Sequence, residues 1–424
     1  MFDYEILFED SELNGNLVII YGENGSGKTT FLHAINHLLT PGFRHETALA
    51  EAQISQLEVV FRDKSSISYR STKDSNTLTL TAPDGTKRTR NIPLENDNEL
   101  RPQRIRRDRD REYFLLQREH STPVTLVTDD RSVIHGGNSR DNSLTRGNDR
   151  YSYGEWRELA AAGALAGFMR DQELHSAVEK ATNALKNATL RGVTTGDGRA
   201  EDHYVRVMRD LAKPHESLTA NEAREALSSQ LESIIEQGRA FSKYGLVALE
   251  QVHDIRAYLQ DMRKNDAALP IIQRVVGPYL ESLDVRMESL REAYEMIDSY
   301  ITAINSFLTR KTTKFTVESG VTITLDSTGE EMSLSSLSSG EKHLLLLISY
   351  AVAARNRGGL FIVDEPELSL GLEWRRNLVP ALLRCAGNNG PQFLLASHAI
   401  EIIAEFEERV VNPSSDRGSK GVNR

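Results

Sequence analysis

The sequence lacks the features that mark secreted and membrane proteins. Cys385 is the single cysteine among 424 residues, so a disulfide framework is excluded and a reducing compartment is favoured. No apolar run reaches the roughly 18 residues that a membrane-spanning helix needs. The first residues, MFDYE, contain neither the basic nor the apolar region of a signal peptide. We therefore expect a cytoplasmic protein with no membrane partner, in which Cys385 packs rather than reacts.

An excess of positive charge is also missing. The chain carries 51 Lys and Arg against 61 Asp and Glu, a formal net charge of −10, which argues against a protein that coats nucleic acid by charge alone. A local exception spans residues 101–111, where six arginines are interrupted by two aspartates. This segment either contacts a phosphate backbone or forms a solvated, partly self-paired loop, and the second interpretation is favoured. DNA therefore stays an open hypothesis as a partner.

The most specific motif is GENGSGKTT at residues 22–30, which matches G-x-x-x-x-G-K-[ST] in full. In such a P-loop the glycines let backbone N–H groups and a helix N-terminus face an anion. The lysine reaches the β- and γ-phosphates, and the following hydroxyl ligands Mg²⁺. We predict ATP and Mg²⁺ as ligands, with Lys28 acting in catalysis and Thr29 holding the metal. The predicted ATP-binding residues here are Asn24, Gly25, Ser26, Gly27, Lys28, Thr29 and Thr30.

Short segments of β and helical pattern surround the P-loop. Residues 4–8 and 17–20 predict two strands, and a helix is expected over 28–39. Alternating residues over 54–94 predict an antiparallel meander, a small β-lobe beside the nucleotide. Residues 129–150 are mostly Asn, Gly, Ser, Asp and Arg, a composition that predicts a mobile surface loop.

The middle of the chain has a helical pattern. Thr219 and Glu222 form an expected capping box at the start of one helix. Two heptad seams follow, over 241–262 and 283–308, with two prolines between them. They predict either a short antiparallel coiled coil, its second helix about 40 Å long, or two helices of a compact bundle. Both interpretations stay open.

Two apolar strand patterns near the C-terminal end are each followed by polar residues. Residues 360–363 precede Asp364 and Glu365, and residues 392–396 precede a serine and His398. Parallel α/β sheets bind ligands at the carboxyl ends of their strands. We predict that Asp364 ligands Mg²⁺, that Glu365 polarises the attacking water, and that His398 bonds a γ-phosphate.

With the run LSSGE at 337–341, these motifs resemble in order the Walker A, signature, Walker B and switch-histidine motifs of ABC-type ATPases. The long insertion and the run DEPELSL at 364–370 are similar to the Rad50/SMC/RecF and OLD-like (AAA15/AAA21) group. Within it, the chain resembles stand-alone ATPase subunits of the Septu and PARIS antiphage systems. Too little chain follows His398 for a Toprim nuclease domain, so any nuclease is expected to act in trans.

The resemblance implies a homodimer, or a higher homo-oligomer, that sandwiches ATP between subunits. The signature would then contact the partner's nucleotide, chiefly through Ser338 and Gly340. Gln117 is the candidate Q-loop residue, binding ATP and the metal, with Gln53 as the weaker rival. After the run DEPELSL the chain continues with Gly371-Leu372, where relatives often carry His-Pro. This departure puts the family's signalling between subunits in question for this chain. The implied signature residues are Leu337, Ser338, Ser339, Gly340 and Glu341; the implied D-loop residues are Ser369 and Leu370; the implied metal ligands are Thr29, Asp364 and Gln117.

We therefore expect an α/β fold, a P-loop ABC-type ATPase head with an antiparallel β-lobe, interrupted by a helical insertion. The expected divisions are 1–150, 151–312 and 313–424. The leading hypothesis is an ATPase that couples nucleotide state to DNA or to a separate effector, a nuclease or toxin, in antiphage defence or DNA repair. The alternative is an ATP-gated scaffold that sequesters such an effector with little turnover. A transport ATPase is disfavoured by the insertion.

Overall fold

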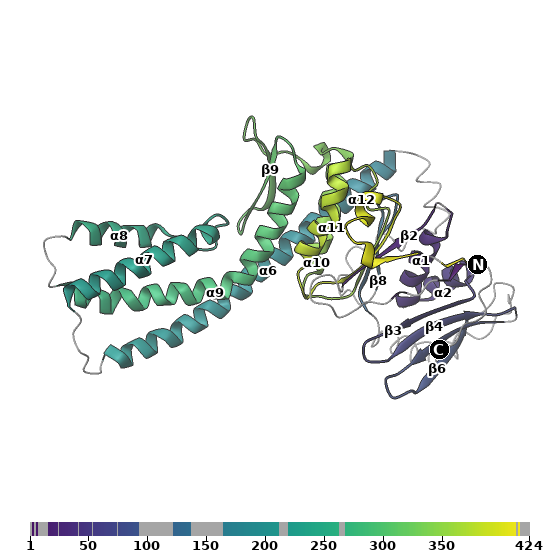
Figure 1. Cartoon of the computed structure of the whole chain (residues 1–424), viewed down its shortest axis with the longest axis horizontal. Helices are drawn as coiled ribbons and strands as arrows, with labels where there is room; N and C mark the ends of the chain where they lie inside the picture. The colour runs from purple at the N-terminus through teal and green to yellow at the C-terminus, as the bar shows by residue number, and fades with distance from the viewer. Residues whose placement is uncertain are drawn as a thin grey trace. The chain divides into compact units, whose positions relative to one another are not determined.

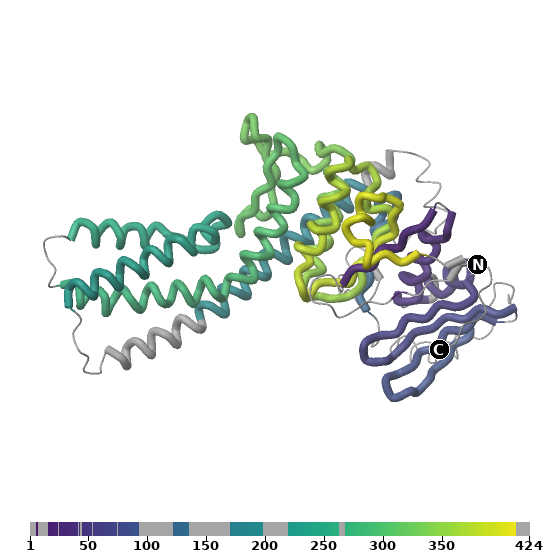
Figure 2. Tube along the Cα trace, in the orientation of Figure 1, coloured from purple at the N-terminus to yellow at the C-terminus, as the bar shows by residue number. Residues whose placement is uncertain are grey.

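The structure is a computed structural model of the chain, shown as ribbon and tube in Figures 1 and 2. It has two compact units, one of residues 1–174, 338–347 and 354–424 and one of 175–337 and 348–353. The described residues are 2–3, 6, 16–23, 25–40, 42–52, 54–73, 75–92, 122–136, 164–211, 219–262, 268–412 and 414–415.

The first unit contains a mostly parallel sheet. Within its described residues six strands are ordered β13-β2-β12-β11-β7-β8, and all neighbours pair parallel except β7 with β8. The central strands are buried on both faces, which explains their continuous apolar runs. The strands are β2 (Leu17–Tyr21), β7 (Val124–Val127), β8 (Val133–Gly136), β11 (Leu360–Asp364), β12 (Gln392–Ser397) and β13 (Val410–Val411).

Strand β8 corrects one expectation. Residues 133–136 were expected to belong to a mobile loop, but they pair antiparallel with β7, Val127 opposite Val133. The two β-branched residues Val133 and Ile134 favour this pairing, a signal that the surrounding polar composition conceals. Residues 137–150 lie outside the described residues.

The predicted helix after the P-loop and the β-lobe are both confirmed. Helix α1 (Lys28–Leu39) ends where expected, and α2 (Phe43–Glu51) follows it. A separate antiparallel sheet has the order β3-β4-β5-β6, and its buried Ile67, Tyr69 and Leu78 share a core with α1 and the parallel sheet. Its strands are β3 (Gln56–Val60), β4 (Ser66–Ser71), β5 (Asn76–Thr81) and β6 (Lys87–Ile92).

The remaining elements of the first unit lie near the chain ends and around the second half of the site. A two-residue pairing joins β1 (Phe2–Asp3) to β14 (Ser414–Ser415), and the strand expected over 4–8 lies almost wholly outside the described residues. Helix α10 (Ser339–Ala354) is shared by the two units. The others are η2 (Leu334–Ser336), assigned to the second unit, and α11 (Leu372–Ala386), α12 (Ile400–Ile403) and η3 (Glu407–Arg409) of the first.

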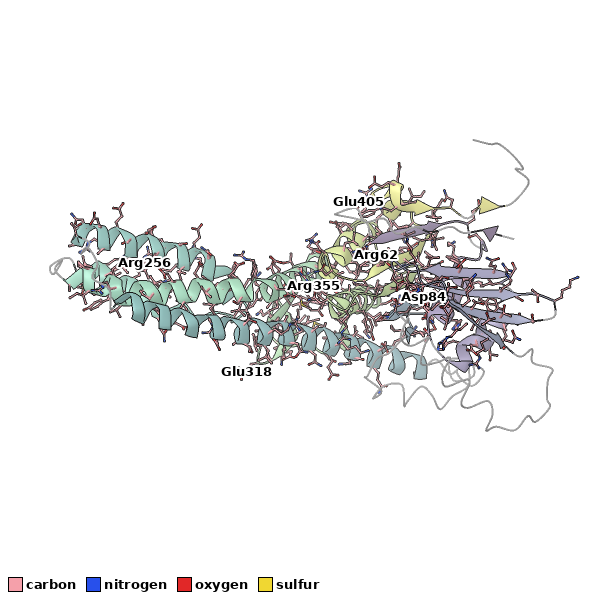
Figure 3. All side chains as sticks on the ribbon, turned by 90° about the horizontal axis from the view of Figure 1, so that it is seen from below. Arg62, Asp84, Arg256, Glu318, Arg355 and Glu405 are labelled. Carbon is pink, nitrogen blue, oxygen red and sulfur yellow. The ribbon has the colours of Figure 1, made fainter. Side chains whose placement is uncertain are left out.

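The second unit is built on long helices. They are α6 (Ala164–Leu211), which starts in the first unit, α7 (Ala220–Ser242), α8 (Glu250–Asp261) and α9 (Leu269–Phe307). The hairpin β9 (Lys311–Thr316) and β10 (Gly320–Leu325) follows them. The capping box of Thr219 and Glu222 at the start of α7 is confirmed. Side chains of this unit, including Arg256 on α8 and Glu318 in the β9–β10 turn, are drawn in Figure 3.

The coiled-coil interpretation of the two seams is wrong. The first seam is not one helix, because α7 ends at Ser242 and the chain turns through Gly245, whose φ of 68° is left-handed. The second helix starts earlier than expected, at Leu269, and is about 58 Å long at 1.5 Å per residue. Its prolines do not end it, since Pro270 lies in the first turn and Pro278 is accommodated inside the helix.

The antiparallel neighbour of α9 is α6 instead. Gly192 lies against Ser289 and Gly196 against Arg286, so the residue numbers run in opposite directions. Helix α7 also packs along α9, where Phe241 contacts Tyr294 and the Tyr244 hydroxyl donates to Asp298 at 2.6 Å. The described helices of this unit therefore form a bundle, but the first seam is divided between α7 and α8 and is not one of its helices.

Candidate functional site

The P-loop curls at the carboxyl end of β2. Gly25 and Gly27 have φ values of 86° and 83°, a left-handed conformation that a side chain would strain. The Ser26 N–H donates to the Glu23 carbonyl at 3.1 Å, and α1 begins immediately after Gly27. Ser26 is buried and Thr29 and Thr30 are exposed. Backbone donors and the start of a helix are thus brought to one place, as an anion site requires.

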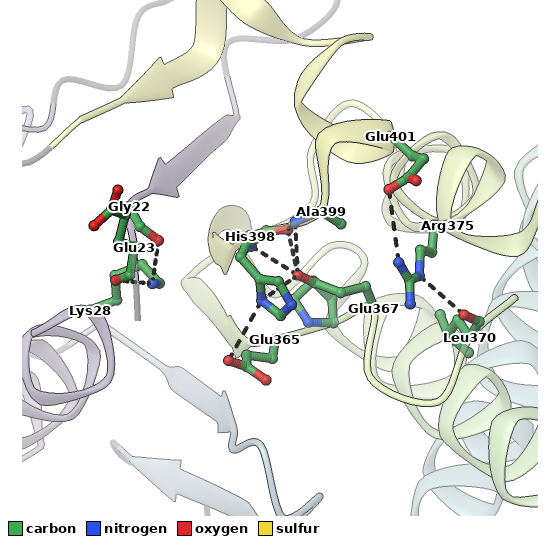
Figure 4. A network of polar contacts seen from close by, with 12 residues as sticks. Gly22, Glu23, Lys28, Glu365, Glu367, Leu370, Arg375, His398, Ala399 and Glu401 are labelled. Carbon is green, nitrogen blue, oxygen red and sulfur yellow. Dashed lines mark hydrogen bonds and ion pairs between the residues drawn. The ribbon is translucent and has the colours of Figure 1, made fainter. Parts of the chain in front are cut away.

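Lys28 is held inside this loop. Its ammonium donates to the carbonyls of Gly22 at 2.7 Å and Glu23 at 3.1 Å, as Figure 4 shows. The side chain is buried, 6% exposed. The positive charge therefore lies within the curl of the backbone, where it faces any phosphate bound there. Asn24, the remaining predicted residue of the loop, lies outside the described residues.

Asp364 ends strand β11, two strands away from β2 in the sheet. It is 1% exposed, and neither carboxylate oxygen has a hydrogen-bond partner of ordinary geometry among the described residues. Burial raises the pKa of this carboxyl, a rise that the neighbouring Thr29 hydroxyl opposes. A carboxylate buried to this extent is completed by a cation, so Asp364 and Thr29 fit Mg²⁺. Mg²⁺ commonly takes one or two protein ligands, with the rest from phosphates and water.

Glu365 and His398 come together from adjacent strands. Glu365 follows β11 and has a left-handed φ of 49°, a conformation uncommon outside glycine. Its carboxylate lies 3.7 Å from Nδ1 of His398, which follows β12 (Figure 4). Both side chains are partly open to solvent, 28% and 48% exposed. An acid and an imidazole thus share the carboxyl edge of the sheet with the P-loop.

Glu367 was missed by sequence reasoning and is the polar centre of this edge. Its side chain is 2% exposed. One oxygen, Oε1, accepts from the Ser397 hydroxyl at 2.8 Å, the His398 N–H at 2.9 Å and the Ala399 N–H at 3.2 Å, and lies 3.2 Å from His398 Nδ1. The carboxylate therefore holds the turn that presents His398. The third acid of the run DEPE was the available signal, but only the fold brings it to residues 397–399.

The predicted signature residues form the start of α10. The Ser338 N–H donates to Glu341 at 2.7 Å, and the Glu341 N–H donates to the Ser338 hydroxyl at 3.4 Å, a capping box. Leu337 is buried, whereas Ser338 and Ser339 are exposed. Two hydroxyls and a helix N-terminus thus lie on the surface of the chain.

The predicted D-loop packs directly on this helix start. A Cβ atom on Gly340 would lie 2.9 Å from the Ser369 carbonyl, so only glycine permits the observed approach. His343 on α10 lies 3.2 Å from the Pro366 carbonyl, and Arg375 donates to the Leu370 carbonyl at 3.1 Å. Leu370 is buried and Ser369 is exposed. Signature and D-loop therefore form one packed surface.

The Q-loop candidates are two glutamines. Gln117 and Gln53 both lie outside the described residues, as do the arginines at 101–111. Strand β11 lies between β12 and β7, and β7 is followed by Thr128 and Asp129. Asp129 contributes to the raised pKa of Asp364, so its charge lies close to the candidate metal site. Sequence reasoning assigned this aspartate to the loop.

Comparison with known proteins places these motifs in context. A family model described as "AAA domain, putative AbiEii toxin, Type IV TA system" matches residues 17–404. No curated protein matches the chain. None of the helices in the described part of the chain combines the length and the hydropathy that a membrane span requires.

Solved structures give a weaker likeness. An Smc head domain with an extended coiled coil, bound to the C-terminal domain of ScpA from Pyrococcus furiosus, is 13% identical with a TM-score of 0.32, covering 93% of this chain and 86% of that one. An SmcHead bound to the C-winged helix domain of ScpA is 10% identical with a TM-score of 0.34, covering 94% and 86%.

Proposed function

This chain belongs to the AAA_21 family of P-loop ATPases, and from that premise we propose that it hydrolyses ATP to ADP and phosphate at the site described above. The observation that carries the proposal is that Lys28, Glu365 and His398 all follow the carboxyl ends of neighbouring strands. Lys28 comes after β2, Glu365 after β11 and His398 after β12, which lies between the other two strands. The alternative is a structural acidic turn after a buried strand. It would not account for an imidazole and a P-loop at the same edge of the sheet.

Each side chain has a role that its surroundings support. Glu365 is partly exposed and accepts the proton of the attacking water as general base. His398 lies beside it and bonds the γ-phosphate, and Lys28 neutralises the negative charge of the phosphates. Bound Mg²⁺, held by Asp364 and Thr29, would supply charge neutralisation of the β- and γ-phosphates.

The exposed signature surface supports a second copy of the chain as part of the site. Ser338 and Ser339 are open to solvent at the N-terminus of α10. Such a surface suits a phosphate. In the proposed dimer the signature of one copy closes on the ATP held by the P-loop of the other.

Glu365→Gln tests the proposed hydrolysis. The amide keeps the shape of the side chain but cannot accept a proton, so ATP should still bind while turnover is lost. A nucleotide-bound dimer should accumulate. Binding is measured with a fluorescent ATP analogue, turnover by phosphate release, and assembly by light scattering. Glu405→Gln, a change at an exposed glutamate of the same unit, is the matched control. Unchanged hydrolysis in the Glu365 variant would refute the assigned base.

We also propose that the chain couples its nucleotide state to a partner. The helical unit joins the two halves of the ATPase in the chain, since α6 starts in the first unit and α10 is shared by both. It would transmit nucleotide state to DNA or to a separate effector such as a nuclease or toxin, in antiphage defence or repair. ATP-dependent co-purification of the neighbouring gene product supports an effector, and ATP-dependent, salt-sensitive DNA binding supports DNA. Retention of an effector without measurable turnover would favour the scaffold alternative.

A further inference from the structure

Arg131 connects two parts of the proposed site that are far apart in sequence. Its guanidinium donates to the Ser339 hydroxyl at 2.8 Å and to the Ser369 hydroxyl at 2.6 Å. The first nitrogen also lies 3.4 Å from the Ser339 carbonyl. The side chain is half-buried, while both serines are exposed. One cation thus lies between the signature and the D-loop, at the surface of the chain.

The turn that carries Arg131 is well ordered by its own bonds. Asp130 accepts from the Thr128 hydroxyl at 2.5 Å, the Ser132 N–H at 3.0 Å and the Ser132 hydroxyl at 2.9 Å. The Arg131 N–H donates to the Thr128 carbonyl at 2.8 Å, and its φ is 67°. Backbone strain of this kind persists where the surroundings impose it. The turn therefore directs the guanidinium toward α10.

Nothing described neutralises this cation. No carboxylate among the described residues forms an ion pair with Arg131, and the nearest acid in sequence, Asp130, is occupied by Thr128 and Ser132. Burial and the positive charge of Arg170 both lower the pKa of Arg131. Hydroxyl groups accept hydrogen bonds but carry no compensating charge. An arginine in such a place favours an anion, and its planar fork matches a phosphate.

We propose that Arg131 is a catalytic residue acting in trans, binding the terminal phosphate of the ATP held by the P-loop of a second copy of this chain. The inference rests on the proposed ATPase dimer. Ser339 and the N-terminus of α10 contribute hydroxyl and backbone donors at the same place, and Arg131 adds the charge that they lack. As phosphate is transferred to water, the guanidinium stabilises negative charge on the γ-phosphate oxygens.

Arg131→Gln should lower ATP turnover by about ten- to a hundredfold, the loss typical of one charge-assisted hydrogen bond in a transition state. Binding of ATP to the P-loop should be retained. Arg131→Lys keeps the positive charge but lacks the planar guanidinium, so its ATP turnover should lie between those of the wild type and Arg131→Gln. Turnover at the wild-type level in Arg131→Gln would overturn the inference.

Mixed dimers separate a role in trans from a role within the same subunit. Copies carrying Glu365→Gln and Arg131→Gln are given different tags and purified together. One site of the mixed dimer then combines both changes, and the other has an intact Glu365 and an intact Arg131. The mixed dimer should show about half the wild-type rate, because a twofold dimer has two such sites. If Arg131 acts on the ATP bound by its own subunit, no activity returns.

A second pair distinguishes failure of this inference from failure of the proposed function. Glu365→Gln is paired with Ser338→Arg, which blocks the signature surface. Restored activity in this pair alone would keep the dimer and reject the trans role of Arg131. Absence of restoration in both pairs, with an active wild-type protein, would reject the shared sites themselves.

Discussion

Glu367 offers the sharpest test of how the site is held together. Glu367→Ala removes the single oxygen that accepts from the Ser397 hydroxyl and from the N–H groups of His398 and Ala399. Ser397 is buried, 0% exposed, so water cannot readily replace the acceptor that its hydroxyl loses. The Ala399 N–H keeps a second acceptor, the Ser397 hydroxyl oxygen at 3.1 Å. Each buried donor left without a partner costs about 1–3 kcal/mol. The turn at 397–399 should therefore lose about 3–5 kcal/mol, near the upper limit for one substitution.

The conservative variant should be milder. Glu367→Gln retains a carbonyl oxygen that can accept the same bonds, and it removes a buried charge whose other oxygen, Oε2, has no hydrogen-bond partner among the described residues. The lost charge weakens bonds that were charge-assisted, by about 1 kcal/mol in total. Comparing the two variants separates the loss of an acceptor from the loss of charge.

Amide hydrogen exchange measures the effect where it is expected. In Glu367→Ala the amides of His398 and Ala399 should exchange about a hundredfold to a thousandfold faster, while those of β2 change little. ATP binding should persist and turnover should fall, because His398 is no longer held. Glu405→Ala is the control, an exposed glutamate whose loss leaves no buried donor. Unaltered protection of residues 397–399 in Glu367→Ala would refute the view that this carboxylate holds the turn.

Two further predictions concern α10. Gly340→Ala would place a Cβ atom 2.9 Å from the Ser369 carbonyl, so the D-loop should shift. Dimer assembly and ATP turnover should fall, while the isolated chain should still bind ATP. Normal dimer assembly would argue against a packed surface of signature and D-loop. Burial, and to a lesser extent Arg131, lowers the pKa of His343 from 6.5 to about 4. The unfolded chain therefore binds a proton there that the folded chain does not, and about 2–3 kcal/mol of stability present above pH 6.5 is lost as the pH falls toward 4. His343→Gln should flatten this slope in denaturant titrations, and an identical slope would contradict the assignment.

Local features of this protein were predictable because short-range physics decides them. The glycines of the P-loop, the helix that begins at Lys28 and the capping box at Thr219 depend on backbone sterics and on bonds between residues a few positions apart. The apolar strand before Asp364 is likewise evident from composition, because a buried parallel strand needs apolar residues on both faces. These features were enough to predict the nucleotide and the sheet edge.

Other features follow from contacts between distant segments. The seam through Gly245 has the period of one helix, yet a left-handed glycine divides it, and the antiparallel neighbour of α9 proved to be α6. Arg131 sits in a stretch whose composition suggests a loop, but pairing of β8 with β7 brings it to Ser339 and Ser369. Glu367 acquires its partners only because β12 lies beside β11. Sequence patterns encode the secondary structure and the motif chemistry, whereas the partners of a buried charge depend on which strands and helices the folded chain brings side by side.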